Sequence, residues 1–305
     1  MSAATMDGNV TAATKQPTGP KPKRVTIGRI GLYAFLIISA AFFLIPVYVM
    51  LITSLKDMPE ILSSNVLTPP LRPTLQPWID AWLHACTGGD CSGLSPGFLN
   101  SVKITVPAVI VSIGISSLTG YALSFWNYKG ANFFFGLLIF GAFVPYQVVI
   151  YPIIIGLRTV HLFSTLPGIV AVHTIFGMPV LVLLFRNFYA GIPIELFKAS
   201  RVDGAGFWQT FFYIMLPMSV PITTVALILQ VTGIWNDFLF GVIYAGRPNW
   251  PMTVQLLNIV KTTQGIPQYD VNMAATIEAA AVPLIIYFVS GRWFVRGIAA
   301  GAVKG

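Results

Sequence analysis

The chain has 305 residues, of which 55% are hydrophobic and only 9% are charged, and its mean hydropathy is +0.77. A soluble domain carries about 25% charged residues, so this composition excludes an ordinary water-soluble protein and indicates that lipid surrounds most of the chain. The net charge of +8 does not indicate a nucleic-acid partner, because the basic residues gather just before the first apolar run, as a topogenic signal does: Lys15, Lys21, Lys23, Arg24 and Arg29.

The N-terminal segment, residues 1–25, is polar and rich in small residues, which predicts a disordered cytoplasmic tail. Its basic residues come too late for a secretory signal peptide, and the apolar run that follows is long enough to span a bilayer. Residues 26–305 are therefore expected to form the folded, membrane-embedded part.

Six apolar segments approach or exceed the roughly 20 residues that a helix needs to cross about 30 Å of hydrocarbon. They predict an all-α polytopic membrane protein with spans at residues 30–53, 102–125, 133–157, 166–185, 218–244 and 273–294. An even number of spans places both termini on one side of the membrane.

The distribution of lysine and arginine predicts which side that is. If the termini are cytoplasmic, the basic residues on the outer side are Lys56, Arg72, Lys103, Arg158, Arg247 and Lys261, and all the others lie inside. This excess agrees with the positive-inside rule. It assigns a loop at 54–101 to the outer side, and a loop at 190–217 and a tail at 295–305 to the cytoplasm.

Two cysteines lie in the predicted outer loop. Cys86 and Cys91 flank a Thr-Gly-Gly-Asp turn that faces an oxidising space, so a small disulfide is expected between them. A pair of free thiols is the alternative.

The second and third predicted spans carry small and polar residues. Ser112, Ser116, Gly120 and Ser124 recur every four residues, which favours close helix packing or a sliding seam of a pore. Pro145 and Pro152 are expected to kink the third span, and Gln147 between them could bond a freed carbonyl or a sugar hydroxyl.

The loop at 190–217 is a polar, helix-forming island between two apolar runs. Pro193 suits a first helical turn, Glu195 lies near the positive end of the helix dipole, and Leu196, Ala199 and Val202 form a narrow apolar stripe suited to a partner's groove. Asp203 is a candidate N-cap for a second short helix, and Gly204 permits a sharp reversal. By spacing alone, the pattern favours an ordinary amphipathic helix-turn-helix on the membrane surface over a docking loop.

This loop resembles the cytoplasmic coupling loop of ABC-importer permease subunits. The matching positions are Pro193, Glu195, Leu196, Ala199, Val202, Asp203, Gly204, Ala205, Leu216 and Pro217. Two residues depart from the family pattern: Lys198 replaces a usual glutamate and Ser200 a usual alanine. Outside the loop, Phe98–Ser101, Gly120–Phe125, Pro145–Gln147 and the tail at 297–305 are similar to maltose-like carbohydrate permeases, and the cysteine loop and Arg186–Tyr189 look closest to glucose/mannose-type subunits.

The resemblance implies a type I ABC-importer permease fold in a bacterial inner membrane. It implies a second permease subunit, an ATPase dimer that binds ATP and Mg, a periplasmic sugar-binding protein and a sugar such as glucose as partners, with no cofactor in this chain. The residues that would couple to the ATPase are Glu195, Leu196, Lys198, Ala199, Asp203, Gly204 and Ala205, joined by Gly301 and Lys304 of the tail.

The fifth and sixth predicted spans contain polar residues at bilayer depth. A charged side chain there costs about 2.5–3.5 kcal/mol, so it usually faces protein or water. Trp235, Asn236, Asp237 and Glu278 are therefore candidates, with Gln147, for a pore or sugar site. Structural contacts of Asp237 and Glu278 are the alternative.

Several functions find no support in the sequence. It has no phosphate-binding loop of the G-x-x-x-x-G-K-[ST] type, its histidines lack metal-ligand spacing, and no nucleophile elbow or paired carboxylates are visible. Catalysis by this chain is not expected. An ion-gradient-driven transporter or channel would explain the six spans but not the loop, and a membrane enzyme would need catalytic groups that are not seen.

Overall fold

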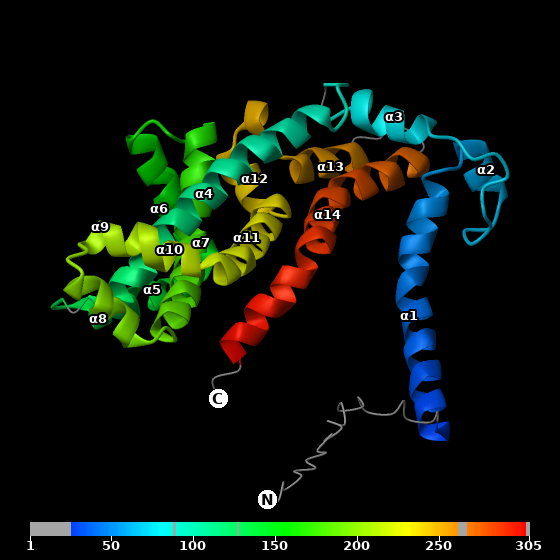
Figure 1. The fold of residues 1–305 in the computed structure, drawn as a ribbon. Helices are drawn as coiled ribbons and strands as arrows, with labels where there is room; N and C mark the ends of the chain where they lie inside the picture. The colour runs from blue at the N-terminus through cyan, green and yellow to red at the C-terminus, as the bar shows by residue number, and fades with distance from the viewer. Residues whose placement is uncertain (1–25, 88–89, 127, 262–266, 303–305) are drawn as a thin grey trace, which may run out of the picture. The chain divides into compact units, whose positions relative to one another are not determined.

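The computed structural model describes residues 26–87, 90–126, 128–261 and 267–302, the last eleven of these by their backbone alone. The chain divides into two compact units, Met1–Tyr48 and Val49–Gly305. Helices make up the regular structure of the described residues, as the sequence predicts (Figure 1). Four helices are long and apolar enough to cross a membrane, and the number rises to six if each of two bent helix pairs forms one span.

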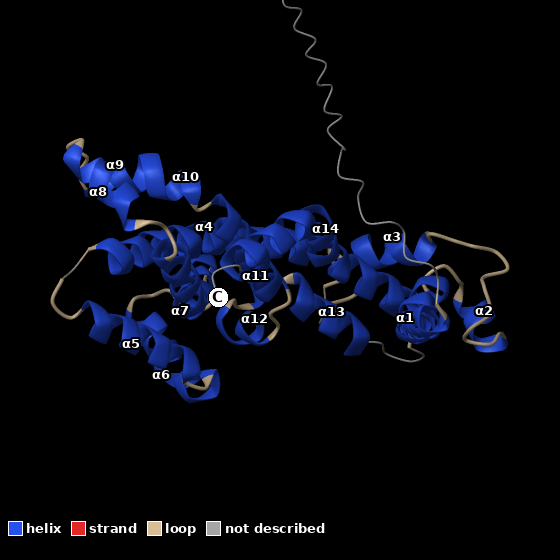
Figure 2. Cartoon of the chain, turned by 60° about the horizontal axis from the view of Figure 1, so that its bottom comes forward, coloured by secondary structure: helices blue, strands red, loops and turns tan. Residues whose placement is uncertain are grey.

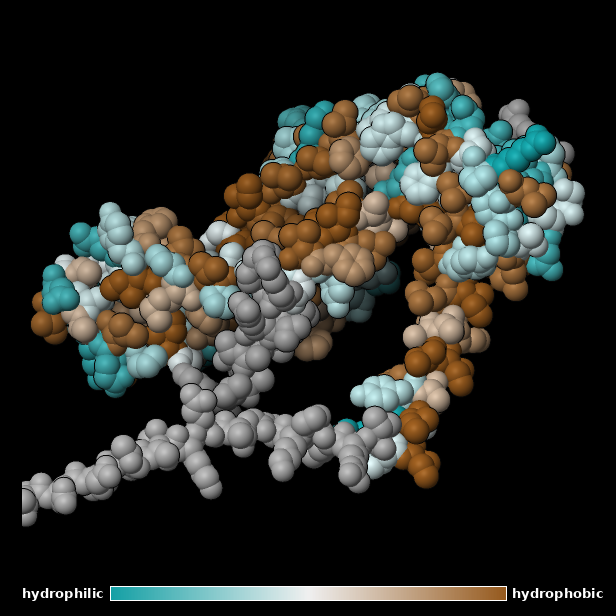
Figure 3. All heavy atoms as spheres, turned by 45° about the vertical axis from the view of Figure 1, so that its right-hand side comes forward, coloured by the Kyte–Doolittle hydropathy of each residue, from teal (hydrophilic) through white to brown (hydrophobic). Residues whose placement is uncertain are grey.

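Helix α1 (Ile27–Thr53) contains the first unit's described residues and ends in the second unit. Its 27 residues are about 40 Å long at 1.5 Å per residue, more than a hydrocarbon core is thick. Large apolar side chains such as Phe42 and Phe43 are exposed, and Figure 3 shows hydrophobic residues along this helix. A helix that is apolar all round is suited to lipid or to another membrane helix.

The expected outer loop contains two short helices, α2 (Met58–Ser63) and α3 (Gln76–Leu83). The next long helix, α4 (Ser95–Phe125), begins seven residues before the predicted span, so the segment 98–101 is already helical. Helix α3 packs on α14 (Tyr269–Ala302), and both contribute to an apolar cluster that also contains Trp235 and residues of α13 (Met252–Lys261).

Helices α4 and α7 (Leu166–Ala190) form the most extensive helix pair of the second unit. Ser112, Ser116 and Gly120 on α4 are buried. A Cβ on Gly120 would lie 2.7 Å from the Phe185 Cβ and 2.8 Å from the Arg186 backbone nitrogen. Small residues therefore let the two backbones approach closely, which favours the static packing interpretation of this row.

The predicted third span is not one straight helix. It consists of α5 (Ala131–Phe143) and α6 (Tyr146–Thr159), which are bent by 106° at Val144–Pro145. Proline lacks an N–H and disfavours a helical conformation in the residue before it, so Pro145 ends one helix and begins the next. Pro152 lies inside α6 without ending it.

The predicted fifth span is also divided. A run of α9 (Phe207–Thr210), η1 (Phe211–Met215) and α10 (Leu216–Met218) meets α11 (Val220–Trp235) at 75°. Helix α11 ends at Trp235, and a break precedes α12 (Leu239–Tyr244), the short η2 (Arg247–Asn249) and α13. The expectation of a continuous helix through residue 244 is therefore wrong.

Candidate functional site

The polar island folds into two short helices joined by a tight turn. Helix α8 (Ile194–Val202) is followed by a turn in which Gly204 has a φ of +82°, and α9 then leads into η1 and α10. A positive φ of this size is open to glycine at no steric cost, as the sequence suggested. Figure 2 shows α8, α9 and α10 together at one end of the second unit. We call residues 193–218 the coupling segment.

Asp203 does not cap the second helix. It is the C-terminal cap of α8, and Gly206 stands at the N-cap of α9, where its N–H donates to Gln209 Oε1 at 2.8 Å. The expected role of Asp203 as an N-cap is therefore wrong, because the turn continues for two residues after the glycine.

The outward face of α8 carries the predicted apolar stripe. Leu196 is 41% exposed, Val202 is 87% exposed and Ala199 is also exposed. Lys198 and Glu195 are exposed beside it. An apolar row framed by charges is the pattern by which one helix docks into a groove of a partner protein.

The inward face of α8 packs on aromatic residues at the end of α4. Phe197 stacks on Phe125 with 5.0 Å between ring centroids, and Trp126 contacts it edge-on at 5.8 Å. Ser200 is buried, and its hydroxyl lies 3.3 Å from that of Thr210 on α9. Ser200, which departs from the family pattern, therefore links α8 to α9 through a buried hydrogen bond.

Tyr121 connects α9 to the α4–α7 pair. It is fully buried, its ring lies 4.9 Å from Phe207 and 5.4 Å from Phe211, and its hydroxyl donates to the Phe207 carbonyl at 3.3 Å. Its ring also contacts Tyr189, whose hydroxyl lies 2.8 Å from that of Ser117. Aromatic contacts of this kind contribute about 0.5–1.5 kcal/mol each beyond area burial, so the coupling segment is firmly attached to the core helices.

Arg201 holds the turn itself. Its guanidinium lies 5.1 Å from the Trp126 ring centroid and donates to the Ala205 carbonyl at 2.8 Å. The hydrogen bond spans the Gly204 reversal, and the cation–π contact attaches the α8 side of the turn to the end of α4.

The pore candidates differ in their surroundings. Trp235 is 3% exposed, its indole N–H donates to the Ala279 carbonyl at 3.0 Å, and its ring packs on Phe98. In this chain its ring face is covered by protein. Gln147 and Asn236 are exposed, and Glu278 is half-buried with one carboxylate oxygen buried without a hydrogen bond. Their contact with a sugar stays a prediction.

Asp237 has a local partner set that explains it without a substrate. Its carboxylate accepts hydrogen bonds from the backbone N–H groups of Phe240 at 3.3 Å and Gly241 at 3.0 Å, at the start of α12. His173 Nε2 lies 3.8 Å away, and Thr253 donates to the Asp237 carbonyl. The Asp237 side chain thus joins the start of α12 to His173 of α7, and its backbone carbonyl joins the α11–α12 break to α13.

Asp237→Ala is therefore expected to lower stability by about 1 kcal/mol, the usual cost of losing a helix cap. Thermal melting of the purified protein measures this, with Asp237→Asn, which keeps an acceptor oxygen, as the milder comparison. In the sugar uptake that the resemblance implies, substrate preference is expected to stay unchanged. A folded variant with an altered preference would instead assign Asp237 to the pore.

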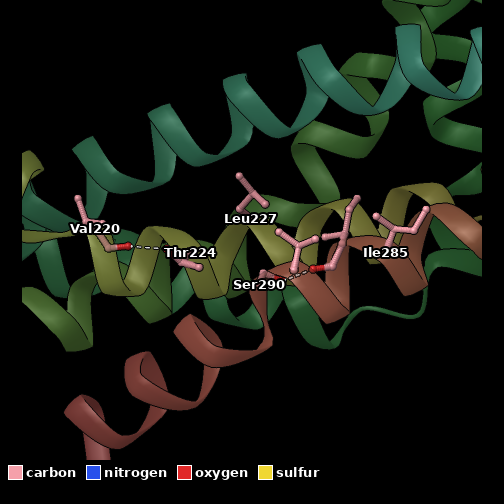
Figure 4. Close-up of a pocket in the computed structure, with 7 residues that line it drawn as sticks. Val220, Thr224, Leu227, Ile285 and Ser290 are labelled. Atoms are coloured by element: carbon pink, nitrogen blue, oxygen red, sulfur yellow. Dashed lines mark hydrogen bonds between the residues drawn. The ribbon is translucent and has the colours of Figure 1, made fainter.

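Two sizeable cavities along the described helices are apolar. A groove of about 560 Å³ between α11 and α14 is lined by residues such as Val220, Leu227 and Ile285 (Figure 4). Its two hydroxyls are bonded within their own helices, Thr224 to the Val220 carbonyl and Ser290 to the Ile286 carbonyl. A second cavity, of about 840 Å³, lies among α5, α6 and α7. Such linings suit acyl chains or another helix better than they suit a sugar.

Two predicted elements remain, the cysteine pair between α3 and α4 and the C-terminal tail. Cys86 and Cys91 are joined in a disulfide. Asp90, which lies between the two cysteines in the sequence, forms an ion pair with Arg247 at 3.6 Å. Gly301 lies in the last turn of α14, and Lys304 lies outside the described residues.

Comparison with known proteins decides the family. Residues 110–300 match the family described as "Binding-protein-dependent transport system inner membrane component". The chain belongs to this family. The match includes the coupling segment and all helices from most of α4 onward, so the resemblance to ABC-importer permeases is confirmed.

Individual relatives agree with this family. The osmoprotective compounds uptake permease protein GgtD of Synechocystis is 34% identical over 215 residues, which cover 70% of this chain and 72% of the relative. The arabinooligosaccharides transport system permease protein AraQ of Halalkalibacterium halodurans is 35% identical over 68% of this chain and 74% of its own length. A crystal structure of a bacterial ABC transporter that imports alginate superposes with a TM-score of 0.76 over 90% of this chain and 99% of the other, at 19% identity. The importer permease therefore has the all-α fold of that transporter.

Proposed function

We propose that this permease is one of two membrane subunits of an ATP-driven carbohydrate importer, and that a separate ATPase acts on it through the coupling segment. The observation that carries the proposal is that one face of α8 is packed against the core helices while the opposite face is exposed. Its inner face packs on Phe125 and Trp126, while Leu196, Ala199 and Val202 stay uncovered. An uncovered apolar row on a firmly attached helix is suited to pass a movement from a partner to the core.

The mechanism that follows is alternating access. A periplasmic binding protein delivers the sugar, closure of an ATPase dimer with ATP and Mg moves the coupling segment, and Tyr121 and Tyr189 pass the displacement to α4 and α7. A second permease subunit supplies the other half of the pore. Because linkage is reciprocal, docking of the binding protein must in turn bias the nucleotide state of the ATPase.

The transported compound is proposed to be a carbohydrate, and specifically glucose or a related monosaccharide. The names of relatives such as AraQ support the broader class. The likeness of the cysteine loop and of Arg186–Tyr189 to glucose/mannose-type subunits supports the narrower one. A thermal-shift screen of the companion binding protein is expected to show stabilisation by monosaccharides and not by disaccharides. Stabilisation by oligosaccharides alone would contradict the monosaccharide assignment.

The orientation proposed for the importer places both termini and the coupling segment in the cytoplasm of a bacterium, with the Cys86–Cys91 loop outside. The tail with Gly301 and Lys304 would then reach the ATPase. In right-side-out membrane vesicles, uptake is expected to stop when ATP is depleted with the proton gradient intact. Uptake that persists would favour an ion-gradient-driven transporter instead.

A further inference from the structure

A buried lysine without a counter-ion lies at the end of α1. Lys56 is 2% exposed, although it carries a charge and follows the last helical residue, Thr53, by only three positions. Its ammonium group donates to Ser64 Oγ at 3.0 Å and to the Asn65 carbonyl at 3.4 Å. An ammonium has three N–H donors, so these two neutral acceptors leave one proton and the whole charge unmatched.

The acidic residues nearest in sequence are engaged elsewhere. Asp57 caps α2 by accepting from the Glu60 N–H, and Glu60 accepts from the Leu71 N–H. In the described part of the chain, no carboxylate oxygen lies within 4.0 Å of the Lys56 ammonium. A buried charge that is left unpaired is strongly unfavourable, and a water molecule would satisfy its remaining N–H but not its charge.

A cavity of about 210 Å³ adjoins the ammonium group. One part of its lining is polar, with Thr53, Ser64 and Asn65 beside Lys56. The other part is contributed by the apolar side chains of Val49, Ile61, Val66 and Met273 and by Tyr269. This volume accommodates a phosphate group together with the first atoms of a glycerol backbone.

The place of the cavity indicates where such an anion comes from. Because Lys56 follows closely on α1, a helix long and apolar enough to span a membrane, we expect it at the depth where lipid head groups meet the hydrocarbon. We propose that this cavity is a binding site for a phosphate anion, in the form of the net-negative phosphodiester of an acidic phospholipid, with Lys56 as its counter-ion. Free inorganic phosphate shares this chemistry and is the other possible source.

The test compares thermal unfolding of the purified permease in nanodiscs of phosphatidylcholine, with and without phosphatidylglycerol. The unaltered protein is expected to melt about 3 °C higher with phosphatidylglycerol, as mass action requires for a ligand of the folded state. Lys56→Met should lose this shift. Arg72→Gln, which removes an exposed charge from the same loop outside the cavity, should keep it.

A second variant keeps the test informative if Lys56→Met does not fold. Asn65→Asp retains the side-chain oxygen that accepts from the Leu67 N–H and places a carboxylate in the cavity. It is expected to melt higher in phosphatidylcholine alone and to respond no further to phosphatidylglycerol. In a separate titration, inorganic phosphate is added to the phosphatidylcholine nanodiscs over a 10-fold concentration range. If it raises the melting temperature of the unaltered protein but not that of Lys56→Met, the site is supported with free phosphate as its occupant. Equal shifts in all four proteins, or no shift with either anion, would overturn the proposal.

Discussion

Val202→Asp is expected to abolish ATP-driven uptake while the permease stays folded. Val202 is 87% exposed at the end of α8, so the substitution removes almost no internal packing. In the proposed complex the same position is buried in the ATPase groove, where a carboxylate would be desolvated without a partner. Loss of one central contact typically costs 2 kcal/mol or more, which is about a 30-fold weaker association. Co-purification of the ATPase and sugar uptake in proteoliposomes measure the effect.

Val160→Asp provides the matched control for this prediction. Val160 is 59% exposed just after α6, so the same charge is introduced at another accessible valine outside the coupling segment. This variant should retain both the ATPase and uptake. If Val202→Asp transports normally with a bound ATPase, the exposed stripe of α8 is not the docking surface.

Gly120→Leu is expected to prevent the permease from folding. The new side chain would begin 2.7 Å from the Phe185 Cβ and 2.8 Å from the Arg186 backbone nitrogen, and neither atom can move without displacing α7. Overpacking of a tight interface costs about 3 kcal/mol, and here it separates the two helices to which the coupling segment is attached. The yield of monodisperse protein and its melting temperature in detergent measure the loss.

Gly114→Leu is the control on the same helix. A Cβ at Gly114 meets no atom within 4 Å, and leucine favours the helix more than glycine does. This variant should fold at least as well as the unaltered protein. Equal yields of the two variants would show that α4 and α7 are not in close contact at Gly120.

The sequence predicts the helical class and the coupling segment because both depend on local patterns. Apolar runs longer than a bilayer require helices, since their backbone polar groups must bond internally. The Pro193 start, the Leu196 stripe and the Gly204 reversal likewise follow from short-range conformational preferences, and the structure has all three. Their docking to an ATPase stays a prediction.

Bends and packing partners were less predictable, because they depend on residues distant in sequence. Hydropathy is continuous across residues 133–157, so it conceals the 106° bend at Pro145, although the proline itself predicted a kink. The polar run at 236–237 looked like a pore site. The Asp237 carboxylate accepts hydrogen bonds from the N–H groups of α12, in a break that hydropathy alone does not reveal, and a role in the pore stays a prediction.

The aromatic residues that attach the coupling segment gave no separate signal in the sequence. Tyr121 and Trp126 end an apolar span, where aromatic residues are common at membrane interfaces. Only the fold brings Tyr121 against Phe207, 86 positions later, and Trp126 against Phe197, 71 positions later. The pattern that predicts this contact is the presence of aromatic residues both at the end of α4 and on α8 and α9 of the coupling segment.

The claim that energy enters through α8 is tested most directly by cross-linking in the assembled importer. Ala199→Cys places a thiol in the middle of the exposed stripe, and Val160→Cys places one outside the coupling segment. With a short bifunctional thiol–amine reagent, the first variant is expected to cross-link to the ATPase, with a yield that changes on ATP binding, and the second is not. An intact, ATP-driven importer in which Ala199→Cys never cross-links to the ATPase would contradict the account.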